Sequence, residues 1–438
     1  MSADRYVLLG LAHVRSAWFT EVARWSTAGS LPAEFVKCLS LEELQARVAS
    51  GRPFSGALLD ARLPAVDRDL VATLADAGVP SLVVAGPTEV RDWSDLGAVA
   101  TLPDPLTRLQ LAEALGEHCH LIDAIEGTAA ITSDEPVRSS AWRGRLVAVT
   151  GHPGAGTSTL AGALAQSLAD DPRYAGDVVL ADLARRAHQA LLHDARDVVP
   201  GIQELVEAHR TGRPAAHELR RLAFDVPDRG YRLVLGLRRP RDWVTIRSRS
   251  FGAALEGLRR SSRIVVADID GDIEGEAETG SFDIEDRNLM ARRTAAQADV
   301  VVLVGQPTTP GLHALVTQLA ELRRLGVSGE RLLVVVNRAP RSGRSRAELT
   351  RSIALLSGAA ERPDPHVGPV YVTDRRGVDH LHRDLARFPG ALADPPGRAV
   401  RDLLDRLPVG GTAASDDEPV AIVPGSLGRW ATEQEGSS

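Results

Sequence analysis

The stretch from residue 146 to residue 160 constrains the fold more than any other part of the sequence, and it reads L-V-A-V-T-G-H-P-G-A-G-T-S-T-L. Its apolar start predicts a buried strand, glycines follow at 151, 154 and 156, and a helical pattern begins at Ser158. A strand, a glycine-rich turn and a helix in this order form a phosphate cradle, because backbone N–H groups converge at the positive end of the helix dipole. The spacing Gly151-x4-Gly156-x-Ser158 is that of a P-loop.

The cation of a P-loop is missing from this stretch. A P-loop carries a lysine just before its Ser/Thr, where it reaches the phosphates, and here that position is Thr157. The sequence contains one lysine, Lys37, so arginine is its usual cation, but that bias does not explain a threonine. The residues predicted to bind nucleotide in this loop are Gly151, His152, Pro153, Gly154, Ala155, Gly156, Thr157, Ser158 and Thr159, and the Ser158 hydroxyl is the predicted Mg²⁺ ligand.

Length and composition set the outer limits. A chain of 438 residues exceeds one ordinary domain, so we expect at least two cores. The net charge of -7 gives no strong nucleic-acid signal, although a local arginine patch stays open. Cys38 and Cys119 have no metal-site spacing and are predicted to be buried free thiols. No apolar run of about 20 residues is present, so we predict no direct membrane span and a cytoplasmic protein.

Residues 1–120 are predicted to form a doubly wound parallel sheet of flavodoxin-like type, because short apolar runs alternate with segments of helical period. The predicted strands are Tyr6 to Leu11, Glu34 to Cys38, Gly56 to Asp60, Ser81 to Ala85 and Ala98 to Leu102, and the predicted helices lie near 14–25, 41–49, 66–77 and 105–119. Residues 121–144 follow neither period and are rich in Gly, Ser, Thr and charge, which predicts a linker.

The stretch A-L-L-D-A-R-L-P at residues 57–64 resembles the phosphoacceptor strand and loop of bacterial response-regulator receivers (CheY-like domains), with Asp60 at the acceptor position. Receivers hold Mg²⁺ with an acidic pair, which here is replaced by Gly10-Leu11-Ala12. Receivers also carry a Ser or Thr after the fourth strand, where this chain has Ala85, and a Lys-Pro pair after the fifth strand, where it has Leu102-Pro103. Phosphoryl transfer to a carboxylate needs those charges. The resemblance therefore implies a degenerate receiver without a Mg²⁺ site, used for docking; residual phosphorylation of Asp60 is the alternative.

The second predicted domain spans residues 145–407, and residues 408–438 read as a disordered, acidic and Gly-rich tail. Near-continuous Val/Leu/Ile runs predict a mainly parallel sheet covered on both faces. After Leu146 to Thr150, the predicted strands are 177–181, 232–237, 263–267, 300–304, 332–336 and 369–372. Helical periodicity marks 311–325, 346–356 and a short last helix at 397–407.

Four strand ends carry residues suited to a ligand, and ligands of such sheets gather at the carboxyl ends of strands. Asp182 and Asp268 each follow an apolar strand and could hold Mg²⁺ or orient its water. Asn337 could read a base edge. Arg238, Arg239 and Arg241 are candidate anion contacts. Taken singly, an Asp or Asn at a strand end is usually a turn or helix-cap residue. Together with the P-loop spacing upstream, these residues favour a nucleotide site.

Over about residues 145–407 this combination resembles the MinD/ParA family of P-loop ATPases. The resemblance implies a catalytic, water-activating role for Asp182, a Walker B metal role for Asp268, and an adenine contact for Asn337. The family also has a second lysine just after the first glycine, where this chain has His152. With both lysines absent, we expect weak ATP binding, with Mg²⁺ as cofactor and little or no hydrolysis. Arg185 or Arg186 could restore the charge, and a homodimer is the implied assembly.

A receiver-like domain joined to a MinD-like domain is similar to the CpaE/TadZ proteins of pilus assembly. The amino-acid sequence of residues 197–209 and 278–292 resembles more closely that of the actinobacterial septum-site-determining branch. The resemblance implies a spatial regulator of cell division with cell-division proteins as partners, recruited to the septum, pole or membrane through a partner. The alternatives are a pilus-assembly localisation protein, an active ATPase in which Arg replaces lysine, and a scaffold that binds no nucleotide.

An acidic run follows Asp268, with carboxylates at every second residue to Glu278 and three more at Asp283, Glu285 and Asp286. In an extended segment this period would place the carboxylates on one face. A solvated loop, a Ca²⁺ or Mg²⁺ site and a docking surface for a basic partner are the three interpretations.

Overall fold

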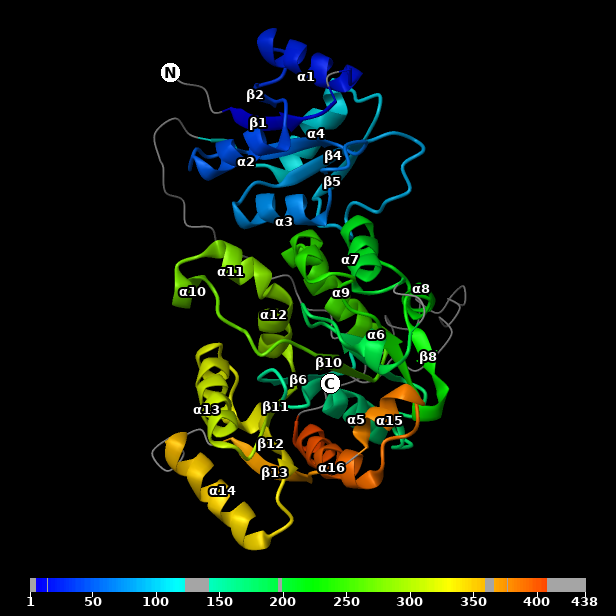
Figure 1. Ribbon diagram of the computed structural model, residues 1–438. Helices are drawn as coiled ribbons and strands as arrows, with labels where there is room; N and C mark the ends of the chain where they lie inside the picture. Colours follow the sequence, from blue (N-terminus) through cyan, green and yellow to red (C-terminus); the bar gives the residue numbers. More distant parts are fainter. Residues whose placement is uncertain are drawn as a thin grey trace, which may run out of the picture.

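Two sheets organise the molecule (Figure 1). The computed structural model describes residues 5–13, 15–122, 142–195, 199–358, 366–375 and 377–407. The predicted tail 408–438 and residues 123–141 of the predicted linker lie outside these ranges.

The first sheet has the order β2-β1-β3-β4-β5, and all its neighbouring strands are parallel. This is the flavodoxin-like order, as the alternation of patterns predicted. Its strands are β1 (Tyr6–Leu11), β2 (Ala33–Cys38), β3 (Gly56–Asp60), β4 (Ser81–Ala85) and β5 (Ala100–Pro103), and its helices are α1 (Ala17–Thr27), α2 (Leu41–Ala49), α3 (Arg68–Asp76) and α4 (Arg108–His118). Side-chain caps begin three of these helices, from Ser40, Asp67 and Thr107.

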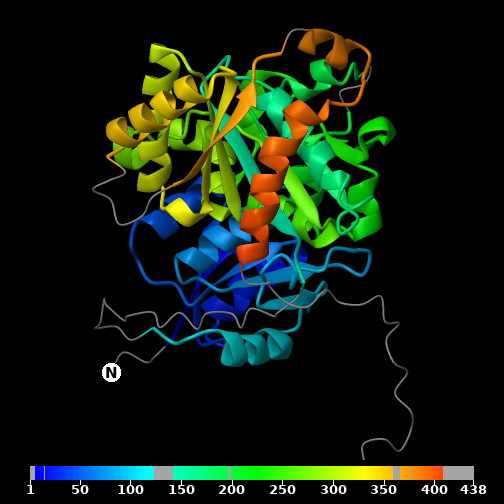
Figure 2. The same ribbon diagram turned by 90° about the horizontal axis from the view of Figure 1, so that it is seen from below.

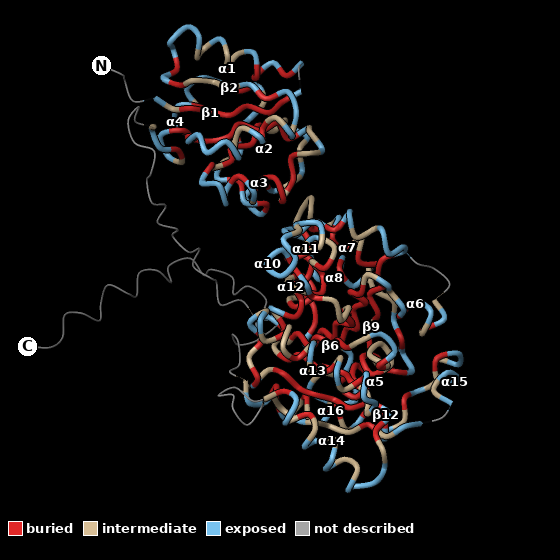
Figure 3. The backbone as a smooth tube through the Cα atoms, turned by 60° about the vertical axis from the view of Figure 1, so that its left-hand side comes forward, coloured by how far each residue is buried: buried red, intermediate tan, exposed pale blue. Residues whose placement is uncertain are grey.

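The second sheet has the order β13-β12-β11-β6-β10-β7-β9-β8 and is parallel except for the edge pair β8–β9. Its strands are β6 (Arg145–Gly151), β7 (Val178–Asp182), β8 (Phe224–Val226), β9 (Tyr231–Val234), β10 (Ile264–Asp268), β11 (Val300–Gly305), β12 (Leu332–Ala339) and β13 (Val367–Thr373). The five strands from β12 to β7 are almost wholly buried, which explains their near-continuous aliphatic sequence (Figure 3).

Helices cover both faces of the second sheet. One face packs on α5 (Thr157–Ala169) and α16 (Gly390–Arg406), and α16 runs along the sheet in Figure 2. The other face packs on α7 (Ile202–Thr211), α8 (Ala216–Arg220), α9 (Ser248–Ser261), α12 (Leu289–Gln297) and α13 (Thr309–Arg324). The remaining elements are the helices α6 (Gln189–Leu192), α10 (Glu276–Thr279), α11 (Phe282–Arg287), α14 (Gly343–Leu356) and α15 (Val378–Arg383), and the 3-10 turns η1 (Pro227–Arg229), η2 (Pro240–Thr245) and η3 (Gly329–Arg331).

The structure differs from the sequence prediction for this domain in one missed strand and in the bounds of the last helix. The three-residue strand β8 was not predicted, because so short a run has no period to detect. The last helix was predicted over 397–407 but begins at Gly390 and continues through Pro395 and Pro396. Leu392 and Ala393 are buried against the same apolar cluster as α5. Their burial maintains a helix that local propensity disfavours.

The two sheets are joined through α3, which lies against α7 and α9 (Figure 1). Arg68 Nε donates to the carbonyl oxygen of His209 at 2.8 Å. Arg210 Nη1 lies 3.0 Å from Asp67 Oδ2. The Asp69 carboxylate accepts from the backbone N–H of Arg249 at 2.9 Å and from the Ser250 hydroxyl. The helix that follows the Asp60 loop is therefore the docking element between the domains.

Candidate functional site

The glycine-rich loop joins the end of β6 to the start of α5 in the predicted cradle geometry. Gly156 precedes the helix in the left-handed region, with φ 88°, and a Cβ there would lie 2.4 Å from Asn337 Nδ2. A Cβ on Gly151 would lie 2.4 Å from the Val304 carbonyl oxygen. Glycine is therefore required at both positions. Gly156 is needed for its left-handed backbone conformation, and Gly151 is needed for the close packing of neighbouring strands.

Two amides from neighbouring strand ends hold the loop. Gln306 Nε2 donates to the Gly154 carbonyl oxygen at 2.5 Å, and Asn337 Nδ2 donates to that of Ala155 at 2.8 Å. Asn337 Oδ1 also accepts from the Arg338 N–H at 2.9 Å. Asn337 therefore lies at the loop as predicted, but its amide binds protein backbone, and contact with a base stays a prediction.

No lysine or arginine belongs to the loop itself. Thr157 Oγ1 and His152 Nε2 are buried atoms with no hydrogen-bond partner in the described residues. Thr159 Oγ1 lies 3.0 Å from His382 Nε2, so it is engaged by α15. The loop thus offers a ligand backbone N–H groups and the end of a 13-residue helix.

Asp182 and Asp268 end the adjacent strands β7 and β10 and are paired in register. Both are buried, with exposed fractions of 0% and 2%. Burial raises the pKa of Asp268 to about 6, while hydrogen bonds from Ser158 and Gln189 act to lower it. Burial, together with the nearby charge of Asp268, raises the pKa of Asp182 well above its usual range. The structure brings the predicted catalytic and metal residues together.

The segment that joins β7 to α6 donates hydrogen bonds from N–H groups to the carboxylates of this site. Asp182 Oδ2 accepts from the Gln189 N–H at 2.8 Å, and Asp270 Oδ2 accepts from the Arg185 N–H at 2.7 Å. The Gln189 side chain donates from Nε2 to Asp268 Oδ2 at 2.7 Å and to the Ser158 carbonyl oxygen at 3.0 Å. Sequence reasoning missed Gln189, because a lone glutamine in a loop belongs to no motif. The connection 184–189 is called the amide clamp below.

A magnesium ion does not fit the site in this arrangement. It would need oxygen lone pairs from Asp268 and Ser158, directly or through water. Asp268 Oδ2 instead accepts a hydrogen bond from Gln189 Nε2 at 2.7 Å. Within the described residues, no group of three or more His, Cys, Asp or Glu could hold a metal ion.

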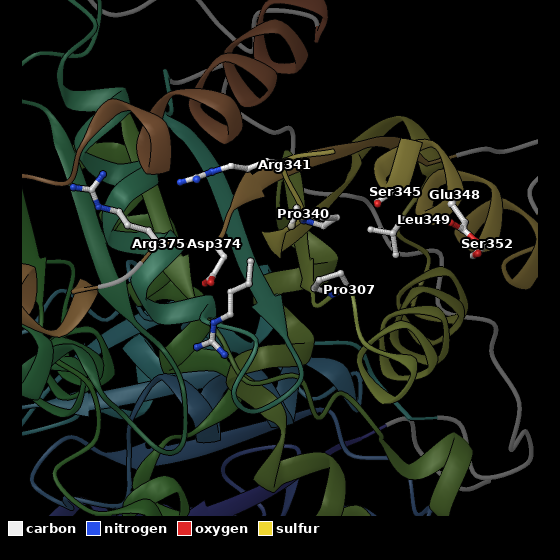
Figure 4. Close-up of a pocket in the computed structure, with 11 residues that line it drawn as sticks. Pro307, Pro340, Arg341, Ser345, Glu348, Leu349, Ser352, Asp374 and Arg375 are labelled. Carbon is white, nitrogen blue, oxygen red and sulfur yellow. The ribbon is translucent and has the colours of Figure 1, made fainter. Parts of the chain in front are cut away.

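A pocket of about 950 Å³ opens beside the loop, at the carboxyl ends of β11, β12 and β13. Arg341, Asp374 and Arg375 lie at one end of it and the residues of α14 at the other (Figure 4). Arg338, which also lines it, has a φ of 52°, a conformation that is uncommon outside glycine. The pocket is large enough for a small ligand and is lined by three arginines.

Only some of the other predicted contacts are engaged within the described residues. The guanidinium of Arg238 pairs with Glu204, whereas no partner of the side chains of Arg239, Arg241, Arg185 or Arg186 is found in the described residues. The acidic run is not one extended face, because it contains α10 and α11. Asp272 pairs with Arg287 at 2.8 Å, and Glu278 Oε2 accepts from the Gly275 N–H at 2.8 Å.

Asp60 is buried and forms an ion pair. Arg62 Nη2 lies 3.0 Å from Asp60 Oδ2 and 3.5 Å from Asp104 Oδ2, and Ser16 donates its hydroxyl to Asp60. Burial acts to raise the pKa of Asp60, but the hydrogen bonds from Arg62 and Ser16 outweigh it and keep that pKa below its usual value. Arg62 provides the positive charge that the receiver resemblance assigns to a metal ion and a lysine.

The fold and site define an α/β protein with a P-loop-type cradle lacking its lysine. The chain is similar to a ParA family ATPase from Chlorobium tepidum (13% identity, TM-score 0.46, 60% of this chain and 99% of that one). It is also similar to the cell division ATPase MinD from Pyrococcus furiosus, with 15% identity and a TM-score of 0.40 over 58% of this chain and 99% of that one. A third similar structure is the septum site-determining protein MinD complexed with Mg-ADP from Pyrococcus horikoshii, with 14% identity and a TM-score of 0.41 over 59% of this chain and 93% of that one.

No protein-family model and no curated protein matches the sequence. In the part of the chain that the structure describes, no helix is both long and apolar enough to cross a bilayer.

Proposed function

We propose that this protein binds a nucleoside triphosphate weakly at the loop 151–159 and hydrolyses it slowly or not at all. The observation that carries the proposal is the loop itself: strand β6, the two constrained glycines and the start of α5 form the cradle, while its lysine position holds Thr157. Backbone N–H groups and the helix dipole suffice to attract phosphate.

The missing cations set the expected affinity and rate. A charge-assisted hydrogen bond is worth about 1.5 to 3 kcal/mol, so each lost lysine weakens binding by roughly tenfold to a hundredfold. The loss in rate is larger, because positioning and electrostatics supply most of phosphoryl-transfer catalysis. The pocket lined by Arg338, Arg341 and Arg375 is the proposed position of the rest of the nucleotide, next to Asn337.

Calorimetric titration with ATP tests binding, and we expect saturation in the millimolar range. Failure to saturate there favours a scaffold that binds no nucleotide. Phosphate release tests hydrolysis, and we expect a rate indistinguishable from that of the Asp182→Ala variant. Turnover that Asp182→Ala abolishes would show an active ATPase instead.

For the cellular role we propose spatial regulation of cell division, through partner proteins rather than a membrane helix. The support is the resemblance of residues 197–209 and 278–292 to septum-site-determining proteins, together with a docked receiver-like domain. Overproduction with cell-length measurement tests this role, and we expect elongated cells. Unchanged cell length together with altered pili would favour the pilus-assembly alternative.

A further inference from the structure

Gln189 binds an oxygen of Asp268, the carboxylate with the predicted metal role, and contacts Ser158 through the backbone carbonyl oxygen rather than the hydroxyl. Its side chain has no exposed surface. Both hydrogens of its amide nitrogen are used, one on Asp268 Oδ2 at 2.7 Å and one on the Ser158 carbonyl oxygen at 3.0 Å. A neutral hydrogen-bond donor therefore occupies an oxygen of the carboxylate that would otherwise face a cation.

The orientation of this amide is fixed by its partners. Oxygen and nitrogen of a glutamine amide are assigned from the hydrogen-bond network. The Ser158 carbonyl oxygen can only accept, and a turned amide would place Gln189 Oε1 against it and against a carboxylate oxygen. In the orientation found, Oε1 is buried and has no partner in the described residues. A buried acceptor without a partner costs about 1–3 kcal/mol, and the two donor contacts offset this cost.

The backbone around Gln189 holds the side chain in place. Its own N–H donates to Asp182, and its carbonyl oxygen lies 2.8 Å from His193 Nδ1. His193 Nε2 in turn lies 2.7 Å from the Tyr231 hydroxyl on β9. Gln189 thus contacts β7, β10 and α5 directly, and it reaches β9 through His193.

We propose that Gln189 is a metal-excluding residue, whose amide holds the Asp268 carboxylate away from a cation so that this site accepts a phosphate ligand without a divalent cation. The inference rests on the proposed function for the identity of the ligand. Its statement about the cation concerns Ser158, Asp268 and Gln189 alone. The amide clamp has to open at Gln189 before Mg²⁺ can reach Asp268.

Mn²⁺ binding tests the inference without any nucleotide, because the electron paramagnetic resonance signal of free Mn²⁺ falls when the ion is bound. The full chain is compared with Gln189→Glu, which keeps the shape of the side chain but replaces its donors with ligand oxygens, and with Gln189→Ala. Gln166→Glu is the matched control, because Gln166 is also buried and its amide also bridges backbone, at Phe388. Circular dichroism confirms that each variant is folded.

We expect the native chain and Gln166→Glu to leave the Mn²⁺ signal unchanged. Gln189→Glu and Gln189→Ala should bind about one Mn²⁺ per chain, roughly tenfold or more tighter than the native chain. Adding Asp268→Asn should abolish this binding. The inference is overturned if the native chain binds one Mn²⁺ in an Asp268-dependent manner, or if folded Gln189 variants bind none.

A second measurement separates this inference from the proposed function. ATP is titrated into the native chain in the presence of Mg²⁺ and in the presence of a chelator, and we expect the same affinity. Affinity raised roughly tenfold by Mg²⁺ would overturn metal exclusion while supporting the nucleotide site. No ATP binding in either condition would reject the proposed function, and the Mn²⁺ result would still decide the role of Gln189.

Discussion

At the scale of single residues, the site combines an intact backbone cradle with side chains that lack positive charge. Thr157 holds the position of the lysine and leaves its hydroxyl without a partner, and Asp182 and Asp268 remain at their strand ends. Asp60 shows the reverse case in the first domain, because its carboxylate is already paired with Arg62.

Thr157→Lys should strengthen ATP binding by roughly tenfold to a hundredfold, because it restores one charge-assisted contact to phosphate. Calorimetric titration measures the change. Thr309→Lys adds the same charge to the exposed first turn of α13 and controls for general attraction of an anion to this edge of the sheet. Equal gains from the two variants would argue against a specific phosphate contact at position 157.

Asp60 should not accept phosphate from a small donor such as acetyl phosphate in the presence of Mg²⁺. Arg62 and Ser16 already bind its oxygens, and Gly10-Leu11-Ala12 stands where a receiver carries the acidic pair that holds the metal. Intact mass spectrometry measures the result. A gain of one phosphate that Asp60→Asn removes would restore the alternative of residual phosphorylation.

At the scale of elements, α3 links the two domains. It begins directly after the Asp60 loop, and its first residues contact α7 and α9 by hydrogen bonds rather than by a large apolar patch. Asp69 is the centre of this interface, because its buried carboxylate accepts from both Arg249 and Ser250. Helix α9 is followed in the chain by β10, and β10 ends in Asp268. These two elements therefore connect the interface to the candidate site.

Asp69→Ala should loosen the interface by about 1–3 kcal/mol, because it leaves the Arg249 N–H and the Ser250 hydroxyl without their acceptor. Hydrogen exchange measures the effect, and the Arg249 amide should lose protection. Asp76→Ala removes only an exposed ion pair with the side chain of the same arginine and should change exchange little. Equal protection in native chain and Asp69→Ala would show that the contact does not hold the domains.

At the scale of the whole molecule, buried titratable groups connect stability to pH. Burial lowers the pKa of His193 and of His209 to about 4, from an ordinary value near 6.5. Asp268 has the opposite shift, since its pKa is raised to about 6. The effects of the histidines and of the carboxylate have opposite signs between about pH 4 and pH 6, and Asp182, whose pKa is also raised by burial, acts in the same direction as Asp268.

His193 and His209 should each contribute a decrease in stability as pH falls from about 6.5 to about 4, because the unfolded chain binds two protons that the folded imidazoles exclude. Thermal unfolding midpoints measured across this range test the sign. His209→Gln should make the decrease shallower. Asp268→Asn should make the decrease in stability steeper. The variant removes a carboxylate whose pKa is higher in the folded chain than in the unfolded chain, and protonation of that carboxylate stabilises the folded chain as pH falls. A change in the opposite direction for either variant would contradict these assignments.

The sequence alone determined the alternation of strands and helices, the flavodoxin-like order of the first sheet and the mainly parallel second sheet, because hydrophobic periodicity and glycine spacing are local properties of the chain. It also located Asp182, Asp268 and Asn337, since parallel strands carry their ligand residues at one edge. The tertiary structure decided what these residues touch. Gln189 reaches Asp268 across 79 positions, Arg62 and Ser16 share Asp60 across 46, and Leu392 keeps α16 helical through packing on α5. Such contacts between distant parts of the chain depend on how elements pack, and no periodicity in a sequence records them.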